Sequence, residues 1–146
     1  MAAAVCANIS GPSATVLNLN QGGTVNLVEG SADIGGSRAS MVNIVAEMLG
    51  IDYRQVRAQI GDTNAIGINA TTGGSRVTFA AGMAVTQATD KVILTLRERS
   101  AKIWNIDIDA VIWEDGEARP AGSNAGEFEP LSLAALAAKA GATGGP

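Results

Sequence analysis

The strongest constraint on the fold is a long stretch of helical periodicity in residues 76–101. Small and branched apolar residues recur three or four positions apart there, at Val77, Ala81, Val85, Ala88, Val92 and Leu96. This spacing places them on one face of an α-helix, and their small size lets another element approach closely. We therefore expect a long helix over residues 76–101 that packs against a neighbour along this face.

Several shorter patterns surround this helix. A second helical pattern starts at Met41 and ends at Gly50, a residue typical of helix C-caps. Two β-branched runs, residues 14–19 and 24–28, are separated by Asn20-Gln21-Gly22-Gly23 and predict a hairpin. The other expected elements are a strand over residues 56–60, a turn over 107–110, a strand over 111–113 that ends at Asp115-Gly116, and a helix over 131–140 with Ser132 near its start.

Helices and strands mix in this order without a strict alternation. We therefore predict the α+β class, with a mixed small sheet and two principal helices. No linker and no long repeat divides the chain, so we expect one domain over residues 1–146, with a flexible tail over residues 141–146. Trp104 and Trp113 are expected to anchor its core.

The composition excludes several kinds of chemistry and partner. The 146 residues contain no histidine and a single cysteine, Cys6, which rules out histidine-based catalysis, histidine metal ligands and cysteine clusters. The net charge is −4, the ten cationic residues are scattered and aromatic residues make up 3% of the chain, so we expect no nucleic-acid partner. No apolar run approaches the ~20 residues of a membrane helix, and the chain does not start like a signal peptide, so we expect a cytoplasmic protein with no membrane contact.

One tetrapeptide occurs twice, each time at the junction between a loop and an expected helix. The copies are Gly35-Gly36-Ser37-Arg38 and Gly73-Gly74-Ser75-Arg76, and the second follows a polar loop over residues 61–74. The first turn of a helix has unpaired N–H donors and the positive end of the helix dipole, and glycines let a ligand reach that backbone. Serine adds a hydroxyl and arginine a charged fork suited to phosphate. The sequence therefore predicts two anion sites, which one elongated ligand could join.

Simpler interpretations remain open for each of these residues. Each serine could merely cap its helix, and each Gly-Gly could be a flexible lead-in. Asp33 could orient the first loop or only accept hydrogen bonds from nearby amides, and Asp62 could face a pocket or form a local Asx-turn. Five acidic residues of a turn-rich stretch are more typical of a solvated surface than of a calcium loop, since the EF-hand spacing is absent. They are Asp107, Asp109, Glu114, Asp115 and Glu117.

The order of these segments resembles a known family. The segments are Gly30-Ser31-Ala32-Asp33-Ile34-Gly35-Gly36-Ser37-Arg38, Ala46-Glu47-Met48-Leu49-Gly50-Ile51, Gly61-Asp62-Thr63, Thr72-Gly73-Gly74-Ser75-Arg76, Glu114-Asp115-Gly116 and Leu131-Ser132-Leu133-Ala134-Ala135-Leu136. Together they are similar to the molybdopterin-binding subunit of the molybdenum hydroxylases, the xanthine dehydrogenase and aldehyde oxidase family. The resemblance covers about residues 14–140, and the ordered set of motifs is more specific than any single one.

The resemblance implies which residues contact a cofactor. In the family the first glycine motif usually reads acidic residue, any residue, Gly-Gln-Gly, and its loop wraps the pyranopterin. Here Gly36 stands at the glutamine and Ser37 at the last glycine, so backbone amides, Ser37 and Arg38 remain for the contact. A branch with Gly-Gly-Ser or Gly-Gly-Thr at this place is similar to bacterial nicotinate-type dehydrogenases. The second motif falls where the family uses backbone and hydroxyl groups. The implied ligand is molybdopterin cytosine dinucleotide carrying molybdenum, held by residues 35–38 and 73–76, with no metal ligand from the protein.

The resemblance also implies that residues 1–146 form a partial molybdopterin-binding domain, which is one part of a longer subunit. The family's subunit is several times longer. The glutamate that acts as its catalytic base lies in a Gly-Glu motif that has no counterpart here. We therefore assign no catalytic residue and expect a fragment that is inactive alone. Its partners would be the remainder of the molybdenum subunit and iron–sulfur and flavin subunits. The full enzyme would hydroxylate N-heterocycles or aldehydes.

Two other functions remain open for the chain. It could be a non-catalytic phosphate- or nucleotide-binding module, or an interaction domain that pairs through the small residues after Val77. A fragment of a larger core should also expose apolar surface, so we expect self-association.

Overall fold

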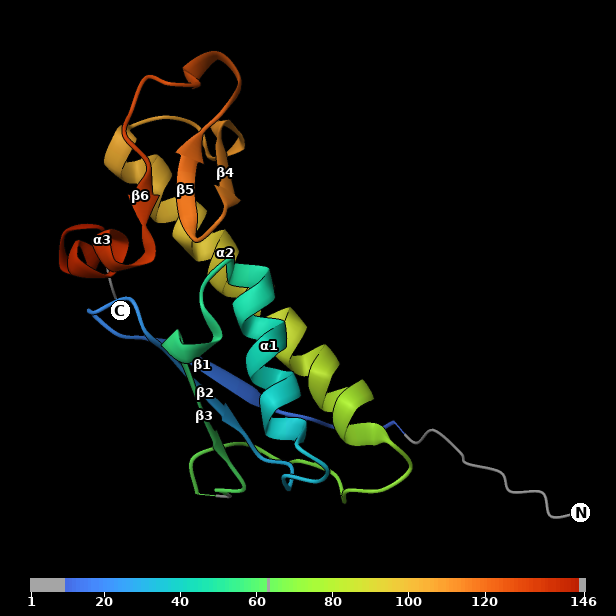
Figure 1. Cartoon of the computed structure of the whole chain (residues 1–146). Coiled ribbons are helices and arrows are strands. Elements are labelled where there is room, and N and C mark those ends of the chain that lie inside the picture. The colour runs from blue at the N-terminus through green and yellow to red at the C-terminus, as the bar shows by residue number, and fades with distance from the viewer. Residues whose placement is uncertain (1–9, 63, 145–146) are drawn as a thin grey trace, which may run out of the picture.

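The computed structural model describes residues 10–62 and 64–144, and Cys6 and Thr63 lie outside this part. The fold contains two three-stranded sheets and three α-helices in the described residues, which confirms the α+β class. The helices and strands are β1 (Thr15–Leu19), β2 (Val25–Glu29), α1 (Ser37–Leu49), β3 (Val56–Ile60), α2 (Gly82–Trp104), β4 (Val111–Glu114), β5 (Glu117–Pro120), β6 (Leu131–Ser132) and α3 (Leu133–Ala138). The two longest helices, α1 and α2, lie side by side and point in the same direction (Figure 1).

The first sheet combines antiparallel and parallel pairing in the order β1-β2-β3. The predicted hairpin is confirmed: β1 pairs antiparallel with β2, and the turn closes with the amide of Asn20 donating to the carbonyl of Thr24 at 2.9 Å. The predicted strand over residues 56–60 is also confirmed, as β3, which pairs parallel with β2. Helix α1 connects these two strands, so it packs on the sheet, and the carboxyl ends of β2 and β3 lie at one edge.

Helix α1 buries the face that its spacing predicts. Met41, Val45 and Leu49 are fully buried, while the helix begins at Ser37, ahead of the predicted start at Met41. Its end is the predicted glycine cap: Gly50 has φ 66°, and the amide of Ile51 donates to the carbonyl of Ala46 at 3.0 Å.

The long helix is confirmed, with different boundaries at both ends. It opens with a π-helical turn, Val77–Ala81, and continues as α2 to Trp104, beyond the predicted end. Four members of the predicted face are buried, and Ala88 and Val92 are partly exposed. Thr89 and Ser100 are buried in the same region, and each hydroxyl donates to the carbonyl four residues earlier, at 2.8 Å.

The second sheet was predicted only in its first strand. β4 follows a short 3-10 turn, Ile108–Ala110, where a turn was expected, and a tight turn at Asp115 and Gly116 leads into β5. Both turn residues have positive φ, 51° and 78°, as this type of hairpin requires. The strands β5 and β6 extend the sheet, and the predicted helix over residues 131–140 is reduced to α3, whose first turn is capped by the hydroxyl of Ser132, which accepts from the amide of Ala135 at 3.3 Å.

The two halves meet at the end of α1. The indole N–H of Trp113 donates to the carbonyl of Leu49 at 3.0 Å, and a Cβ at Gly50 would lie 2.7 Å from the amide nitrogen of Gly116. Trp104 is buried and stacks on Phe128 with ring centroids 5.9 Å apart. Both tryptophans therefore contribute to the core, as predicted.

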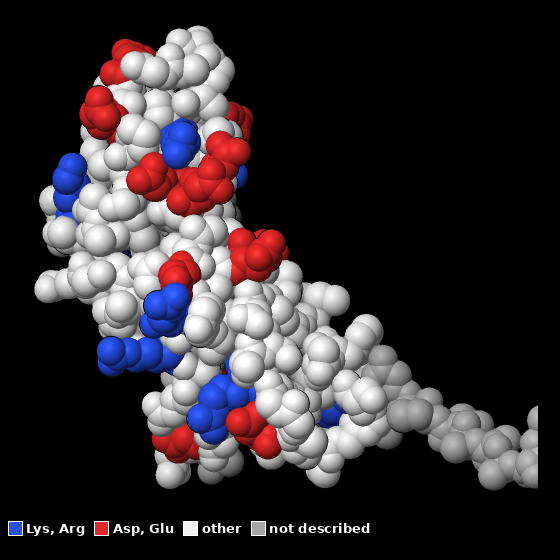
Figure 2. Space-filling model, viewed as in Figure 1, with Lys and Arg blue, Asp and Glu red and all other residues white. Residues whose placement is uncertain are grey.

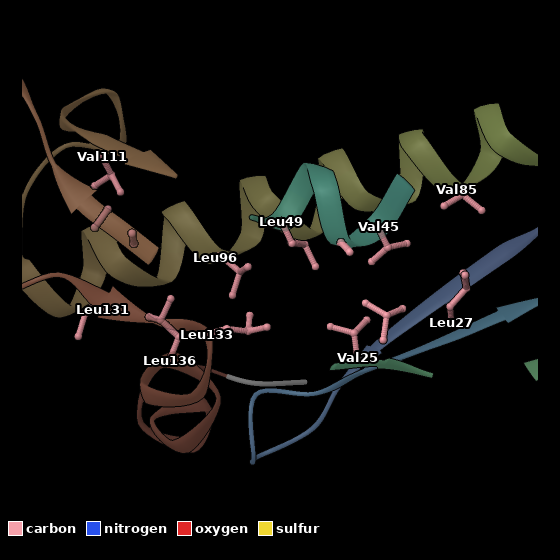
Figure 3. Close-up of a cluster of buried hydrophobic side chains, with 14 of the residues drawn as sticks. Val25, Leu27, Val45, Leu49, Val85, Leu96, Val111, Leu131, Leu133 and Leu136 are labelled. Carbon is pink, nitrogen blue, oxygen red and sulfur yellow. The ribbon is translucent and has the colours of Figure 1, made fainter. Parts of the chain in front are cut away.

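One apolar core runs along α2 and joins both sheets. Figure 3 shows side chains of α1 and α2 facing those of the first sheet, and side chains of β4, β6 and α3 continuing the same row. On the face shown in Figure 2, acidic side chains gather mainly over the half that holds β4 to β6. Within the part of the chain that the structure describes, no helix is long and apolar enough to cross a membrane.

The C-terminal segment is only partly tested by the structure. Residues Ala140–Ala142 form a 3-10 turn, and Arg99 donates to the carbonyl of Ala140 at 3.3 Å and to the hydroxyl of Thr143 at 3.2 Å. The beginning of the predicted tail is therefore bonded to α2, and its flexibility stays a prediction.

Candidate functional site

The two copies of the tetrapeptide lie at the same end of the molecule. Helices α1 and α2 point in the same direction, so both N-terminal ends lie at the lower end in Figure 1, together with the loops that precede them. A hollow of about 180 Å³ lies between these ends. Its lining residues are Ile34, Ser37, Thr72, Ser75, Arg76, Val77 and Thr78. The structure therefore brings both predicted sites to one place.

The first copy forms a left-handed turn that enters α1. Gly35 and Gly36 have φ values of 60° and 81°, and a Cβ built at either would meet no atom within 4 Å. Ser37 is the first helical residue, and its hydroxyl accepts a hydrogen bond from the amide of Ile34 at 3.1 Å. The helix has no side-chain N-cap, so the simpler interpretation of Ser37 as a cap is wrong. The exposed glycine backbone remains open to a ligand.

Asp33 stabilises this turn from its outer side. Its carboxylate accepts a hydrogen bond from the amide of Arg38 at 3.0 Å and forms an ion pair with the Arg38 side chain, Nε to Oδ2, at 3.3 Å. The interpretation of Asp33 as a partner of nearby amides is thus confirmed. The Arg38 side chain is 55% exposed, so its remaining N–H groups face solvent beside the turn.

The second copy forms a similar turn that is offset by one residue. Here Gly74 and Ser75 have the positive φ values, 55° and 59°, and Arg76 is the cap of the π-helical turn. The hydroxyl of Ser75 makes no capping bond to the helix, so this serine is not a cap either. Because of the offset, the two serines and the two arginines hold different positions relative to their helices.

Because of this offset, the two arginines differ in burial. Arg76 is 1% exposed, and its guanidinium donates to the carbonyls of Ala70 at 2.8 Å and Pro12 at 2.9 Å and to the hydroxyl of Ser13. Its Nε lies buried without a hydrogen-bond partner among the described residues. Arg76 therefore ties the loop before α2 to the segment before β1, while Arg38 stays at the surface.

The long loop over residues 61–74 is held by its own polar side chains. The carboxylate of Asp62 accepts from the amide of Asn64 at 2.9 Å, which confirms the local Asx-turn. The side-chain oxygen of Asn69 accepts from the amide of Ala14 at 3.3 Å. Thr72, near the end of this loop, lines the hollow, and the sequence did not indicate its place there or that of Ile34, Val77 and Thr78.

The backbone donors of both turns are unused. In residues 10–62 and 64–144, no hydrogen bond is donated by the amides of Gly35, Gly36, Gly73, Gly74 or Ser75. Each of these turns leads into a helix, where free N–H groups and the positive end of the helix dipole favour an anion. The described part of the chain also contains no group of three or more His, Cys, Asp or Glu side chains that could hold a metal ion.

Comparisons with known proteins agree with this geometry. Residues 2–145 match the family model described as molybdopterin cofactor-binding domain. No curated protein matches the chain. Among solved structures, a Cu,Mo-CO dehydrogenase in the carbon monoxide reduced state has a TM-score of 0.78 at 24% identity, with 88% of this chain and 16% of that chain covered.

Two further structures show the same fold. Reconstituted CO dehydrogenase from Oligotropha carboxidovorans has a TM-score of 0.78 at 23% identity and covers 88% of this chain and 16% of its own. Quinoline 2-oxidoreductase from Pseudomonas putida 86 has a TM-score of 0.72 at 20% identity, with 92% of this chain and 17% of its own covered. This chain therefore spans about a sixth of the length of these relatives. The family match over residues 2–145 identifies the chain as a member of the molybdopterin cofactor-binding domain family.

Proposed function

We propose that the chain holds molybdopterin cytosine dinucleotide in the hollow between its two left-handed turns. The observation that carries this proposal is the meeting of two turns with unused amides at the N-terminal ends of α1 and α2. Two parallel helices add the positive ends of their dipoles at the same place, which favours a negatively charged group such as a diphosphate.

The residues present fit such a group. Gly35, Gly36 and Gly73 have no atom within 4 Å of the place where a Cβ would stand, so a ligand can approach their backbone. Arg76 lines the hollow, and its guanidinium is held by the carbonyls of Ala70 and Pro12, so this residue fixes the backbone of the second turn beside the ligand.

Each residue then has a distinct role. The amides of Gly35, Gly36, Gly73 and Gly74 would donate to ligand oxygens. The hydroxyls of Ser37 and Ser75 would add side-chain contacts, Arg38 would pair with a charge at the open rim, and Arg76 would position the second turn. When bound, the cofactor supplies the molybdenum and its redox chemistry. We assign no catalytic role to the side chains of residues 10–62 and 64–144.

The size of the hollow indicates that other parts complete the site. Its 180 Å³ is below the roughly 300–1,000 Å³ of a typical ligand pocket, so it can enclose only part of a dinucleotide. We infer that the remainder of a molybdenum subunit covers the rest and that iron–sulfur and flavin partners accept the electrons. The assembled enzyme would hydroxylate N-heterocycles or aldehydes in the cytoplasm, and the chain alone would be inactive.

A charge test at Ser75 examines the proposal directly. Ser75 is exposed and has positive φ, which Asn and Asp tolerate better than other side chains. Ser75→Asp places a negative charge in the hollow, and Ser75→Asn is the matched neutral control. The chain is co-expressed with the remainder of its subunit, and molybdenum and acid-released cytidine monophosphate are measured in the purified complex.

We expect Ser75→Asp to lower both contents at least about tenfold and Ser75→Asn to retain them. Equal contents in the two variants would refute the contact. Micromolar binding of simple nucleotides by the chain alone, with no molybdenum in the complex, would instead assign the hollow to a nucleotide-binding module.

A further inference from the structure

A second concave surface lies away from the glycine turns, between β1 and α2. It is a groove of about 530 Å³, bounded at one end by α3 and the turn after it. Its floor is apolar: Leu96 and Leu136 are 2% and 1% exposed, and Leu17, Leu19 and Val92 are partly buried beside them. None of the residues that line this groove belongs to the cofactor hollow.

One side of the groove is the free edge of a sheet. In the order β1-β2-β3, β2 is the only strand that pairs with β1 among residues 10–62 and 64–144 (Figure 1). In an antiparallel pair, successive residues alternate between backbone groups that face the partner strand and groups that face away from it. The hydrogen bond from the amide of Asn20 to the carbonyl of Thr24 fixes this alternation, so the backbone groups of Val16 and Asn18 face β2 and those of Leu17 and Leu19 point outward. Those outward groups can form a ladder with an added strand.

The charged side chains that line the groove are positive. Lys91 and Arg99 line it, and no carboxylate does, although the whole chain carries a net charge of −4. Arg99 donates to Ala140 and Thr143 from one guanidinium nitrogen, Nη1, and keeps its positive charge. A segment that enters the groove therefore gains from acidic side chains near its ends.

We propose that an acidic, extended segment from the remainder of the molybdenum subunit docks in this groove as a fourth strand on β1. This inference rests on the proposed function, because the relatives of similar fold extend far beyond the matched part. A second copy of this chain fits less well. Pairing two β1 edges would bring Lys91 and Arg99 of one copy toward the same cations of the other.

The test uses the full chain and a defined probe. The probe is the blocked peptide Glu-Glu-Val-Thr-Val-Thr-Val-Glu-Glu, and its counterpart has lysine in place of every glutamate. Each peptide is titrated into isotope-labelled protein while backbone amide resonances are followed. We expect the acidic peptide to shift the amides of Leu17 and Leu19 and to bind at least about tenfold more tightly than the basic peptide.

Charge reversal separates this groove from other surfaces. Lys91→Glu is expected to reverse the preference between the two peptides, whereas Lys102→Glu, on an exposed part of α2 outside the groove, should change it less than about twofold. The absence of amide shifts at about 1 mM peptide, equal affinities, or shifts confined to β3 would each overturn the proposal.

Two additional measurements identify a wrong occupant or a wrong function. A dimer in sedimentation that is lost in Ala138→Trp, a substitution that fills the groove, would assign the surface to a second copy and overturn the proposal. The molybdenum and cytidine contents of the Ser75 variants do not depend on the groove. If the peptide does not bind in the groove but the Ser75 variants change the cofactor content as expected, only the docking proposal is refuted. If the peptide binds but the Ser75 variants have equal cofactor contents, only the proposed function is refuted.

Discussion

The two arginines of the repeated tetrapeptide show how far identical residues can differ in environment. The spacing correctly located both copies at helix starts, but it could not show that the left-handed pair of residues is shifted by one position in the second copy. That shift turns Arg76 into the interior and leaves Arg38 at the surface. The difference depends on the carbonyls of Pro12 and Ala70, which only the folded chain brings within reach.

Truncating the two arginines should therefore have unequal effects on stability. We expect Arg76→Ala to lower the free energy of unfolding by about 2–3 kcal/mol, because the carbonyls of Ala70 and Pro12 lose hydrogen bonds from a charged donor. Arg76→Lys should recover only part of this loss, since an ammonium cannot reproduce the fork. Arg38→Ala should cost less than about 1 kcal/mol, as is usual for an exposed ion pair. Urea unfolding followed by circular dichroism measures all three, and similar losses at the two arginines would contradict the assigned roles.

At the scale of elements, the chain is most predictable where local spacing and core packing agree. The face of α1, the glycine cap at Gly50 and the hairpin were all read correctly, because each depends on neighbours along the chain. Strand β5 was missed because Glu117-Ala118-Arg119-Pro120 has one apolar side chain that alternates with charged ones and ends in proline. Its local preference for a strand is weak, and its hydrogen-bonded pairing with β4 and β6 stabilises it instead.

The junction between α1 and the second sheet depends on two glycines. A Cβ at Gly50 would lie 2.7 Å from the amide nitrogen of Gly116, and both residues have positive φ. We expect Gly50→Ala to lower the free energy of unfolding by at least about 1–2 kcal/mol from backbone strain alone. Gly22→Ala is the control, because nothing lies within 4 Å of its Cβ position. Thermal unfolding of both variants tests this, and an unchanged midpoint for Gly50→Ala would show that the junction adjusts freely.

At the scale of the whole molecule, apolar side chains remain exposed near the end that holds the two glycine turns. Ile34, Phe79 and Met83 are 60%, 53% and 51% exposed, and Phe79 and Met83 lie one turn apart at the start of the long helix. The sequence indicated exposed apolar surface in general terms. Its location could not be predicted, because it depends on which faces the two helices leave uncovered after packing on the sheet.

This apolar surface should make the isolated chain associate with itself. We expect sedimentation velocity to show oligomers that increase with protein concentration, because association removes apolar area from water. The double variant Phe79→Lys with Met83→Lys should shift the population toward monomer, whereas Leu94→Lys, another exposed apolar site on α2, should have a smaller effect. A wild-type chain that stays monomeric at every concentration would contradict the prediction.

The parallel arrangement of α1 and α2 also gives the molecule an electrical direction. Each helix contributes about half an elementary positive charge at its N-terminal end, so two such charges add at the glycine turns. Seven carboxylates lie in the segment from the turn before β4 to the start of β6: Asp107, Asp109, Glu114, Asp115, Glu117, Glu127 and Glu129. An anion that diffuses toward this acidic protein is therefore repelled at one end and attracted at the other. Its rate of association should fall as ionic strength rises, even though the protein and the anion carry net charges of the same sign.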